Sequence, residues 1–245
     1  MLSNLKNEFK KNGYFLISDE KLKEDVKSLK NKIWSICNAI GKNEGFEFLN
    51  EENFSKFFNH DINFRKNLYE SLQKLKENYH ISQNQIVDDI LYKLGLKAPT
   101  LRNVSLRIDL PNEEKYLQPM HQDVNSMESE NCLNFWVPLQ SVNKQVGSMV
   151  LFEGSHKLGH ISYRKVVRGY PAIDSQKLKN FKKVFIKADL GNLVVFHPCL
   201  VHGSSSVTKQ IRFTSIFRYD DLSQITWLKN KYNPLKKYHE DIIDI

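Results

Sequence analysis

Three side chains of the 245-residue chain have the types and the order of a metal site. His121 and Asp123 are separated by one residue, and alternate side chains of an extended segment project to the same side, so an imidazole and a carboxylate can meet at one point. His202, far along the chain, is the candidate third ligand. Two histidines and one carboxylate leave the other positions of a metal open, as in non-haem Fe(II) oxygenases. Alone, a His-x-Asp pair is weak evidence, because it also occurs in surface turns.

Arg212 gives this pattern a second chemical feature. Only seven of the 36 basic residues are arginine, so the chain uses lysine wherever a simple cation suffices. The planar guanidinium grips a carboxylate through two parallel bonds, which lysine cannot reproduce. An inward-facing Arg212 can therefore hold the far carboxylate of a dicarboxylate bound to the same metal, and the hydroxyl of Ser204 can add to that grip.

The elements that position these residues differ between the two parts of the chain. Residues 1–100 are predicted to be mostly helical: apolar residues recur every three or four positions over 22–40, a stretch ended by Gly41, and again over 64–79 and 86–94. We expect these helices to brace the fold and to take no part in chemistry.

Beyond Pro99 the sequence consists of short runs of β-branched and aromatic residues between turn residues. Such a series indicates a barrel or a double-sheet jelly roll, so the fold is expected to be mainly β with α. In the last strand, residues 211, 213, 215 and 217 alternate with residues 212, 214, 216 and 218. The expected strands are 102–110, 132–139, 148–152, 184–186, 193–196 and 210–218.

Composition limits the class of protein. With 40% apolar residues and no long apolar run or signal peptide, the chain is expected to be a single cytoplasmic domain, 1–245, without a membrane segment. Its core is expected over 101–220, and 221–245 forms a tail that the pattern does not place. The three cysteines lack any CxxC pair, which argues against a disulfide framework or thiolate zinc. The net charge of +8 favours an anionic partner, but no nucleic-acid-binding motif appears, and no pattern selects an oligomeric state.

Several segments together resemble the phytanoyl-CoA dioxygenase family of Fe(II)- and 2-oxoglutarate-dependent oxygenases. The resemblance extends from the opening turn to Tyr219 and is most specific in the second half of the chain. It implies a double-stranded β-helix, or jelly-roll, core of the cupin type. The matching segments are Asn12-Gly13-Tyr14-Phe15, His121-Gln122-Asp123, 134–139, 147–159 and 191–212.

This resemblance implies a role for each matching residue. His121, Asp123 and His202 would bind iron, Arg212 and Ser204 would hold 2-oxoglutarate, and Trp136 would line the site. With Fe(II), 2-oxoglutarate and O₂, the expected reaction is hydroxylation of a C–H bond of a small, anionic metabolite, with release of succinate and CO₂. Because halide-transferring relatives lack the carboxylate, the presence of Asp123 favours hydroxylation.

Two residues depart from the family pattern, and three others have open roles. Asn192 stands where the family often has Asp, and His197 where Pro or Asp is commoner. His197 competes with His202 for the distal ligand position, and we interpret it as structural. Three weaker substrate-contact candidates are equally compatible with structural roles: Arg107, Gln118 and His156.

Two other functions are compatible with the same fold. One is a cupin-like metal-dependent isomerase or hydrolase, which would be indifferent to 2-oxoglutarate and O₂. The other is a non-catalytic barrel that only binds a ligand. The intact set of His121, Asp123, His202 and Arg212 argues against the second, because a decayed site would not keep all four.

Overall fold

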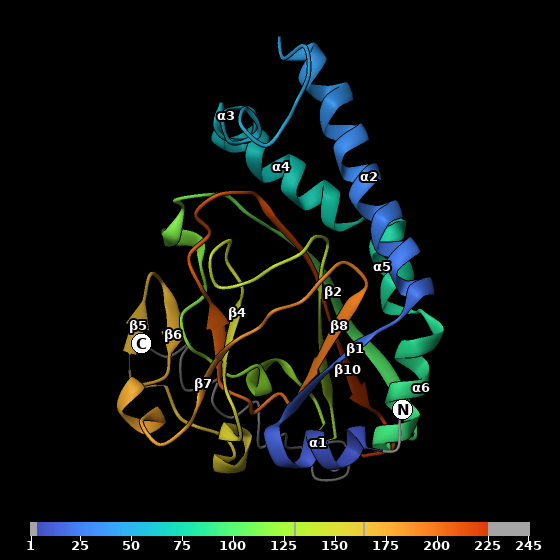
Figure 1. The fold of residues 1–245 in the computed structure, drawn as a ribbon, viewed down its shortest axis with the longest axis vertical. Helices are drawn as coiled ribbons and strands as arrows, with labels where there is room; N and C mark the ends of the chain where they lie inside the picture. The colour runs from blue at the N-terminus through green and yellow to red at the C-terminus, as the bar shows by residue number, and fades with distance from the viewer. Residues whose placement is uncertain (1–3, 130, 164, 225–245) are drawn as a thin grey trace.

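A computed structural model describes residues 4–129, 131–163 and 165–224 (Figure 1). The fold is mixed α/β with antiparallel sheets. The larger sheet has five strands in the order β1 (Tyr14–Ser18), β8 (Asn192–Phe196), β3 (Leu133–Pro138), β10 (Arg212–Asp221) and β2 (Pro99–Asp109). The smaller has the order β7 (Lys183–Phe185), β4 (Met149–Phe152) and β9 (His202–Ser204). A separate hairpin pairs β5 (Lys165–Val167) with β6 (Tyr170–Ala172).

In the described part of the chain, six α-helices support the five-stranded sheet, mainly along one side of it (Figure 1). Buried leucines and isoleucines of the long second helix join one apolar core with Phe135, Phe213 and Phe217 of the sheet. Burial of this apolar surface stabilises the sheet from its outer face and leaves the inner face free for polar side chains. The helices are α1 (Leu5–Asn12), α2 (Glu20–Asn43), α3 (Phe54–Asn59), α4 (Ile62–Gln73), α5 (Lys76–Ser82) and α6 (Gln85–Leu94). Short 3₁₀ turns are η1 (Glu114–Tyr116), η2 (Val124–Ser126), η3 (Ser155–Leu158) and η4 (Ser175–Leu178).

The expected helical support is confirmed, with two differences in the bounds. Asp19 caps the start of helix α2, because its side chain accepts a hydrogen bond from the Leu22 amide at 2.7 Å, but the helix continues through Gly41. The single helix expected over 64–79 is two, because Leu75 has an extended ψ of 132° and interrupts the helical backbone. Because apolar residues recur at helical spacing on both sides of this break, the sequence pattern did not reveal it.

All six expected strands are present, within a few residues of their predicted ends. The sequence did not predict β1, β9 or the β5–β6 hairpin. Strand β9 has only three residues, one of them Gly203, so it carries no alternating apolar signal. Within the described residues no helix is long and apolar enough to cross a membrane. Most of the tail expected over 221–245 lies outside the described residues.

Candidate metal and 2-oxoglutarate site

One face of β10 carries the polar residues of a pocket between the two sheets. Arg212, Thr214, Ile216 and Arg218 line this pocket together with Trp136 of the neighbouring strand β3. The alternation follows from the pleat of the strand, which sends every second side chain to the same face. The expected inward position of Arg212 therefore follows from the register of the strand.

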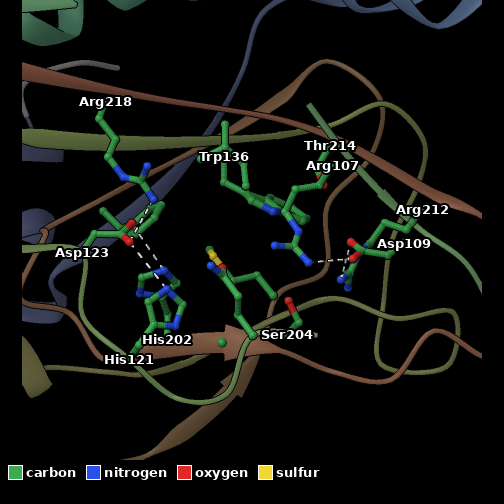
Figure 2. Close-up of a pocket in the computed structure, with 15 residues that line it drawn as sticks. Arg107, Asp109, His121, Asp123, Trp136, His202, Ser204, Arg212, Thr214 and Arg218 are labelled. Atoms are coloured by element: carbon green, nitrogen blue, oxygen red, sulfur yellow. Dashed lines mark hydrogen bonds and ion pairs between the residues drawn. The ribbon is translucent and has the colours of Figure 1, made fainter. Parts of the chain in front are cut away.

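The candidate metal ligands meet at one end of the pocket (Figure 2). His121 and His202 form an isolated antiparallel bridge, with amide-to-carbonyl distances of 2.8 and 3.0 Å. The Nε2 atoms of His121 and His202 lie 3.5 and 3.6 Å from the two carboxylate oxygens of Asp123. One nitrogen or oxygen from each residue lies within 4.8 Å of the other two. Tertiary structure thus brings His202 to the neighbouring pair His121 and Asp123, from which it is distant in the sequence.

The side chain of Gln122 anchors this segment on the opposite side. Its amide nitrogen donates to the carbonyls of Gly159 and Cys199 at 2.8 and 2.6 Å, and its amide oxygen accepts from the Ile161 amide at 2.8 Å. The Asp123 amide donates to the Pro198 carbonyl at 2.9 Å. The expected extended segment is thus a β-bridge followed by the η2 turn, and these bonds keep residues 121 and 123 on the same side.

The orientation of both imidazoles suits metal binding. The Nδ1 atoms of His121 and His202 lie 2.8 and 3.0 Å from the carbonyls of Pro119 and Leu200. Because a carbonyl can only accept, each Nδ1 must carry the proton, and this leaves the Nε2 lone pair directed at Asp123. Among the described residues, neither His121 Nε2 nor Asp123 Oδ2 has a hydrogen-bond partner although both atoms are buried.

These orphaned atoms fit a divalent metal ion. Metal bonds of about 2.1 Å to nitrogen and oxygen place adjacent ligand atoms roughly 3 Å apart, close to the separations seen here. Two nitrogens and one carboxylate oxygen are the donor set of the facial triad of non-haem Fe(II) proteins. The residues therefore fit iron, with Nε2 of both histidines and Oδ2 of Asp123 as the ligands.

Arg218 completes this end of the pocket, and the sequence interpretation missed it. Its Nη2 donates to Asp123 Oδ1 at 2.9 Å (Figure 2), and its Nη1 donates to Asn103 at 3.2 Å. Arg218 lies on the same alternating face as Arg212, so the period of the strand was the signal that could have found it. Arg218 thus holds Oδ1, which lies 3.5 Å from His121 Nε2, while the unpartnered Oδ2 lies 3.6 Å from His202 Nε2.

Burial and charge set the protonation of this group. Burial works to raise the pKa of Asp123, but Arg218 and the two histidines outweigh it and hold this pKa far below its usual range. Burial, with His121 nearby, lowers the pKa of His202 to about 4. Near neutral pH the carboxylate is ionised and His202 is neutral, which are the forms that bind metal.

The other end of the pocket holds a buried cluster around Asp109 (Figure 2). Arg212 donates to Asp109 Oδ2 from Nε at 3.1 Å and from Nη2 at 2.9 Å, and Arg107 donates to Oδ1 at 2.8 Å. Cross-strand pairing places Arg212 opposite Asp109 in β2 and Thr214 opposite Arg107. Two guanidinium groups thus share one carboxylate, and one positive charge is left over.

This surplus charge fits the far carboxylate of 2-oxoglutarate. In the part of the chain that the structure describes, the buried Arg212 Nη1 and Thr214 Oγ1 have no hydrogen-bond partner. Ser204 also lines the pocket, below Arg107 in the view of Figure 2. These donors converge from two facing sheets, as a dicarboxylate reaching from the metal would require.

The remaining sequence candidates fall into two groups. Trp136, Gln118 and Arg107 all line the pocket; contact of Arg107 or Gln118 with substrate stays a prediction. His156 does not line the pocket: its Nε2 lies 3.2 Å from the Lys10 carbonyl, and its ring lies 5.3 Å from that of His197, beside α1. The structure thus places His156 outside the metal pocket, because the turn that carries it packs against the N-terminal helix, and its weak candidacy for substrate contact stays a prediction without support from this position.

His197 lies with His156, away from the metal ligands. Its Nδ1 accepts a hydrogen bond from the Cys199 amide at 3.0 Å, and its ring lies 5.9 Å from that of Phe9. Burial, with His156 beside it, lowers the pKa of His197 to about 4. The position agrees with the structural role that the sequence suggested for His197.

Comparisons with known proteins find similar sequences and folds. A family model described as phytanoyl-CoA dioxygenase (PhyH) matches residues 9–214. Peroxisomal phytanoyl-CoA dioxygenase of Homo sapiens is 22% identical over 210 residues, which cover 80% of this chain and 61% of the relative. The corresponding enzyme of Mus musculus is also 22% identical with the same coverage. The chain thus spans about three fifths of the length of these curated relatives.

Solved structures show a similar fold. The epimerase SnoN, in complex with Fe³⁺, alpha ketoglutarate and nogalamycin RO, has a TM-score of 0.61 and 15% identity, covering 90% of this chain and 83% of its own. EctD from S. alaskensis, with 2-oxoglutarate and 5-hydroxyectoine, has a TM-score of 0.61 and 14% identity, covering 91% of this chain and 77% of its own. At such low identity these similarities concern the fold alone.

Proposed function

Because this chain belongs to the phytanoyl-CoA dioxygenase (PhyH) family, we propose that it is an oxygenase that hydroxylates a C–H bond of a small molecule. Fe(II), 2-oxoglutarate and O₂ are the cofactor and co-substrates of this family, as the sequence predicted. The observation that carries the proposal is the meeting of His121, Asp123 and His202, with two of their buried ligand atoms left unpartnered among the described residues.

We propose that the two facing sheets are the halves of a double-stranded β-helix. Both are antiparallel, and the pocket between them is lined from both. A single domain over 1–245, the cytoplasmic location and an anionic substrate stay predictions from composition.

In the proposed reaction, the residues of this chain bind the metal ion and 2-oxoglutarate, orient them and shield them from water. His121, His202 and Asp123 would hold iron, while Arg212, Thr214 and Ser204 would hold the far carboxylate of 2-oxoglutarate. The chemistry supplied when both are bound is oxidative decarboxylation of 2-oxoglutarate by O₂ to succinate and CO₂, coupled to oxidation of the substrate.

Fixed geometry is the main contribution of the protein. The carbonyls of Pro119 and Leu200 keep the proton of each histidine on Nδ1, and Arg218 holds Oδ1 of Asp123, which leaves Oδ2 available to a metal ion. Trp136 and Phe196 form apolar walls that limit water in the pocket.

An anaerobic titration tests the proposal. Adding Fe(II) and then 2-oxoglutarate to the protein should produce the weak visible charge-transfer band of the bound pair. Asp123→Ala should abolish both this band and succinate formation, while Asp89→Ala, which removes an exposed carboxylate on α6, should change neither. Full turnover by the Asp123 variant would refute the assignment.

The same titration separates the alternatives. A metal-dependent isomerase or hydrolase would bind metal and act without 2-oxoglutarate or O₂, and a simple binding barrel would form no band. Product analysis separates hydroxylation from a stereochemical inversion, which is relevant because SnoN is described as an epimerase.

A further inference from the structure

The main chain at Arg212 lies just beyond the end of one of its two neighbouring strands. Strand β10 pairs with β3 only as far as Thr214, opposite Pro138, whereas its pairing with β2 continues to Arg212. Arg212 therefore lies inside the β2 ladder and past the last β3 pair. Ile211 and Phe213, on either side of it, are each only 1% exposed, so their peptide groups need partners other than water.

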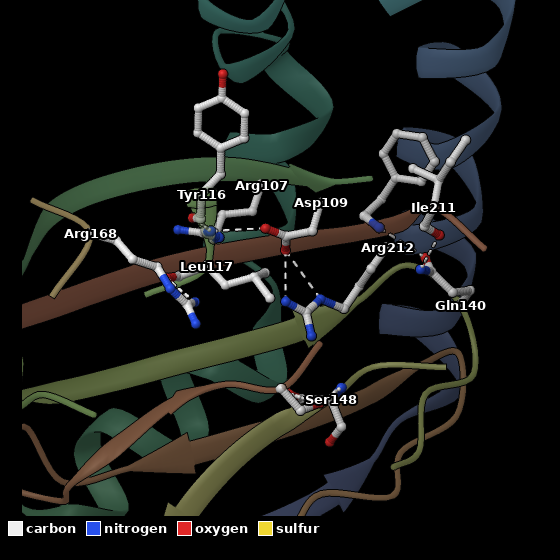
Figure 3. Close-up of polar contacts among 11 residues, drawn as sticks. Arg107, Asp109, Tyr116, Leu117, Gln140, Ser148, Arg168, Ile211 and Arg212 are labelled. Carbon is white, nitrogen blue, oxygen red and sulfur yellow. Dashed lines mark hydrogen bonds and ion pairs between the residues drawn. The ribbon is translucent and has the colours of Figure 1, made fainter. Parts of the chain in front are cut away.

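A single side-chain amide bonds the peptide groups on both sides of Arg212. Gln140, two residues after the end of β3, donates from Nε2 to the carbonyl of Ile211 at 2.9 Å (Figure 3). Its Oε1 accepts a hydrogen bond from the Phe213 amide at 3.3 Å. A glutamine amide carries a donor and an acceptor, as a peptide group does. Gln140 thus takes the place that β3 would fill if the strand continued.

The other two peptide groups of this segment are also bonded. The Ile211 amide donates to Glu51 Oε2 at 2.9 Å, and the Phe213 carbonyl accepts from the Leu139 amide at 3.0 Å. Glu51 is exposed, so water can replace the bond that it makes. Gln140 is only 9% exposed, and loss of its amide would leave two buried groups without a partner.

The two ends of the Arg212 side chain are thus held by different residues. Its guanidinium donates two hydrogen bonds to Asp109 Oδ2, which fixes the plane of the fork (Figure 3). Gln140 fixes the main chain from which the side chain extends. Gln140 itself does not line the metal pocket, so it can affect a molecule in that pocket only through other residues.

We propose that Gln140 is a positioning residue for 2-oxoglutarate: it holds the main chain at Arg212 so that the guanidinium reaches the far carboxylate. This inference rests on the proposed function of the pocket. Without the amide of Gln140, the end of β10 loses two buried hydrogen bonds and shifts. A small displacement of a bidentate contact weakens it strongly, so 2-oxoglutarate binds less tightly although the residues that contact it are unchanged.

Two ligands separate this role from a general structural one. The carbon chain of 2-oxopentanoate equals that of 2-oxoglutarate, but it ends in a methyl group in place of the far carboxylate. Binding of each ligand to the Fe(II)-loaded protein is followed without O₂ through the visible charge-transfer band. Gln140→Met keeps the length of the side chain and removes its hydrogen bonds. It should weaken 2-oxoglutarate about tenfold and 2-oxopentanoate less than about twofold, because only 2-oxoglutarate uses Arg212.

Two further variants control for folding. Asn78→Leu is matched, because Asn78 on α5 is also a buried amide bonded to β10, to Ser215 Oγ at 2.6 Å, but on the face of the strand opposite Arg212. It should lower the Tm and leave the affinity for both ligands unchanged. Gln140→Asn keeps an amide that is one methylene too short to reach both peptide groups. Its 2-oxoglutarate affinity should lie between those of wild type and Gln140→Met, and it gives the measurement if Gln140→Met does not fold.

The outcomes distinguish this inference from the function on which it rests. Unchanged 2-oxoglutarate affinity in the Gln140 variants, an equal loss of affinity for both ligands, or an equal loss in Asn78→Leu would each overturn the positioning role. None of these results affects the proposed function as long as the wild type forms the band. A wild type that binds Fe(II) but forms no band with 2-oxoglutarate would refute the proposed function and the positioning role with it.

Discussion

Replacement of Arg218 by glutamine should weaken iron binding, although a charge argument alone predicts the opposite. Arg218 places a positive charge 2.9 Å from Asp123, so its removal lowers the repulsion felt by a dication. However, the same contact holds Oδ1 and so fixes the plane of the carboxylate, with the free Oδ2 3.6 Å from His202 Nε2 among the described atoms. We expect the lost orientation of the Asp123 carboxylate to weaken iron binding more than the lower repulsion strengthens it.

The expected magnitude follows from the position of the contact. Loss of a partner that orients a metal ligand typically reduces metal affinity by about 10- to 100-fold, or about 1.4 to 2.8 kcal/mol. Burial places Arg218→Gln near the upper part of this range, because Asp123 is only 4% exposed and solvent cannot replace the lost bond. Arg218→Lys keeps the charge without the planar fork and should lie between glutamine and wild type.

Competition with a chromophoric chelator measures the affinity directly. The matched control is Arg102→Gln, because Arg102 is also paired with a carboxylate, Glu128 at 2.6 Å, but its side chain is 44% exposed and lies outside the metal pocket. Thermal unfolding without metal checks that each variant is folded. Tighter iron binding by Arg218→Gln, or an equal loss in Arg102→Gln, would refute the orientation argument.

Three further predictions concern other parts of the molecule. Arg212→Lys should raise the 2-oxoglutarate concentration for half-maximal turnover about tenfold, since a point charge replaces the planar guanidinium. An unchanged concentration would mean that other residues bind the far carboxylate. His197 has a pKa of about 4 when folded and an ordinary value near 6.5, so the unfolded state binds the extra proton between these values and stability falls as the pH drops from 6.5 to 4. His197→Phe should remove up to about 3 kcal/mol of this loss in denaturant titrations, and an unaltered pH slope would contradict it. Gly13→Ala should lower the free energy of unfolding by more than about 1 to 2 kcal/mol, because Gly13 has φ +83° and a Cβ there would clash with His156 Nδ1. The control is Gly45→Ala, at φ +82° with open space around it, which should cost only the backbone strain of a positive φ. Equal losses of stability in the two variants would exclude the steric effect.

Local periodicity determined much of the candidate site in advance. The pleat of a strand sends alternate side chains to one face, so the sequence alone placed Arg212 on the face opposite Phe213. The same rule put His121 and Asp123 on one side, although the segment between them is a bridge and a turn. These features depend only on residues that are neighbours in the chain, so they can be predicted from the sequence alone.

Tertiary structure determined which distant residues contact one another. Asp109 contacts Arg212 because β2 pairs with β10 across more than a hundred residues, and Arg218 contacts Asp123 although 95 positions separate them in the chain (Figure 2). His156 lies beside α1 for the same kind of reason. Strand pairing and loop packing join residues that are distant in the chain, and no local period records which of them will meet.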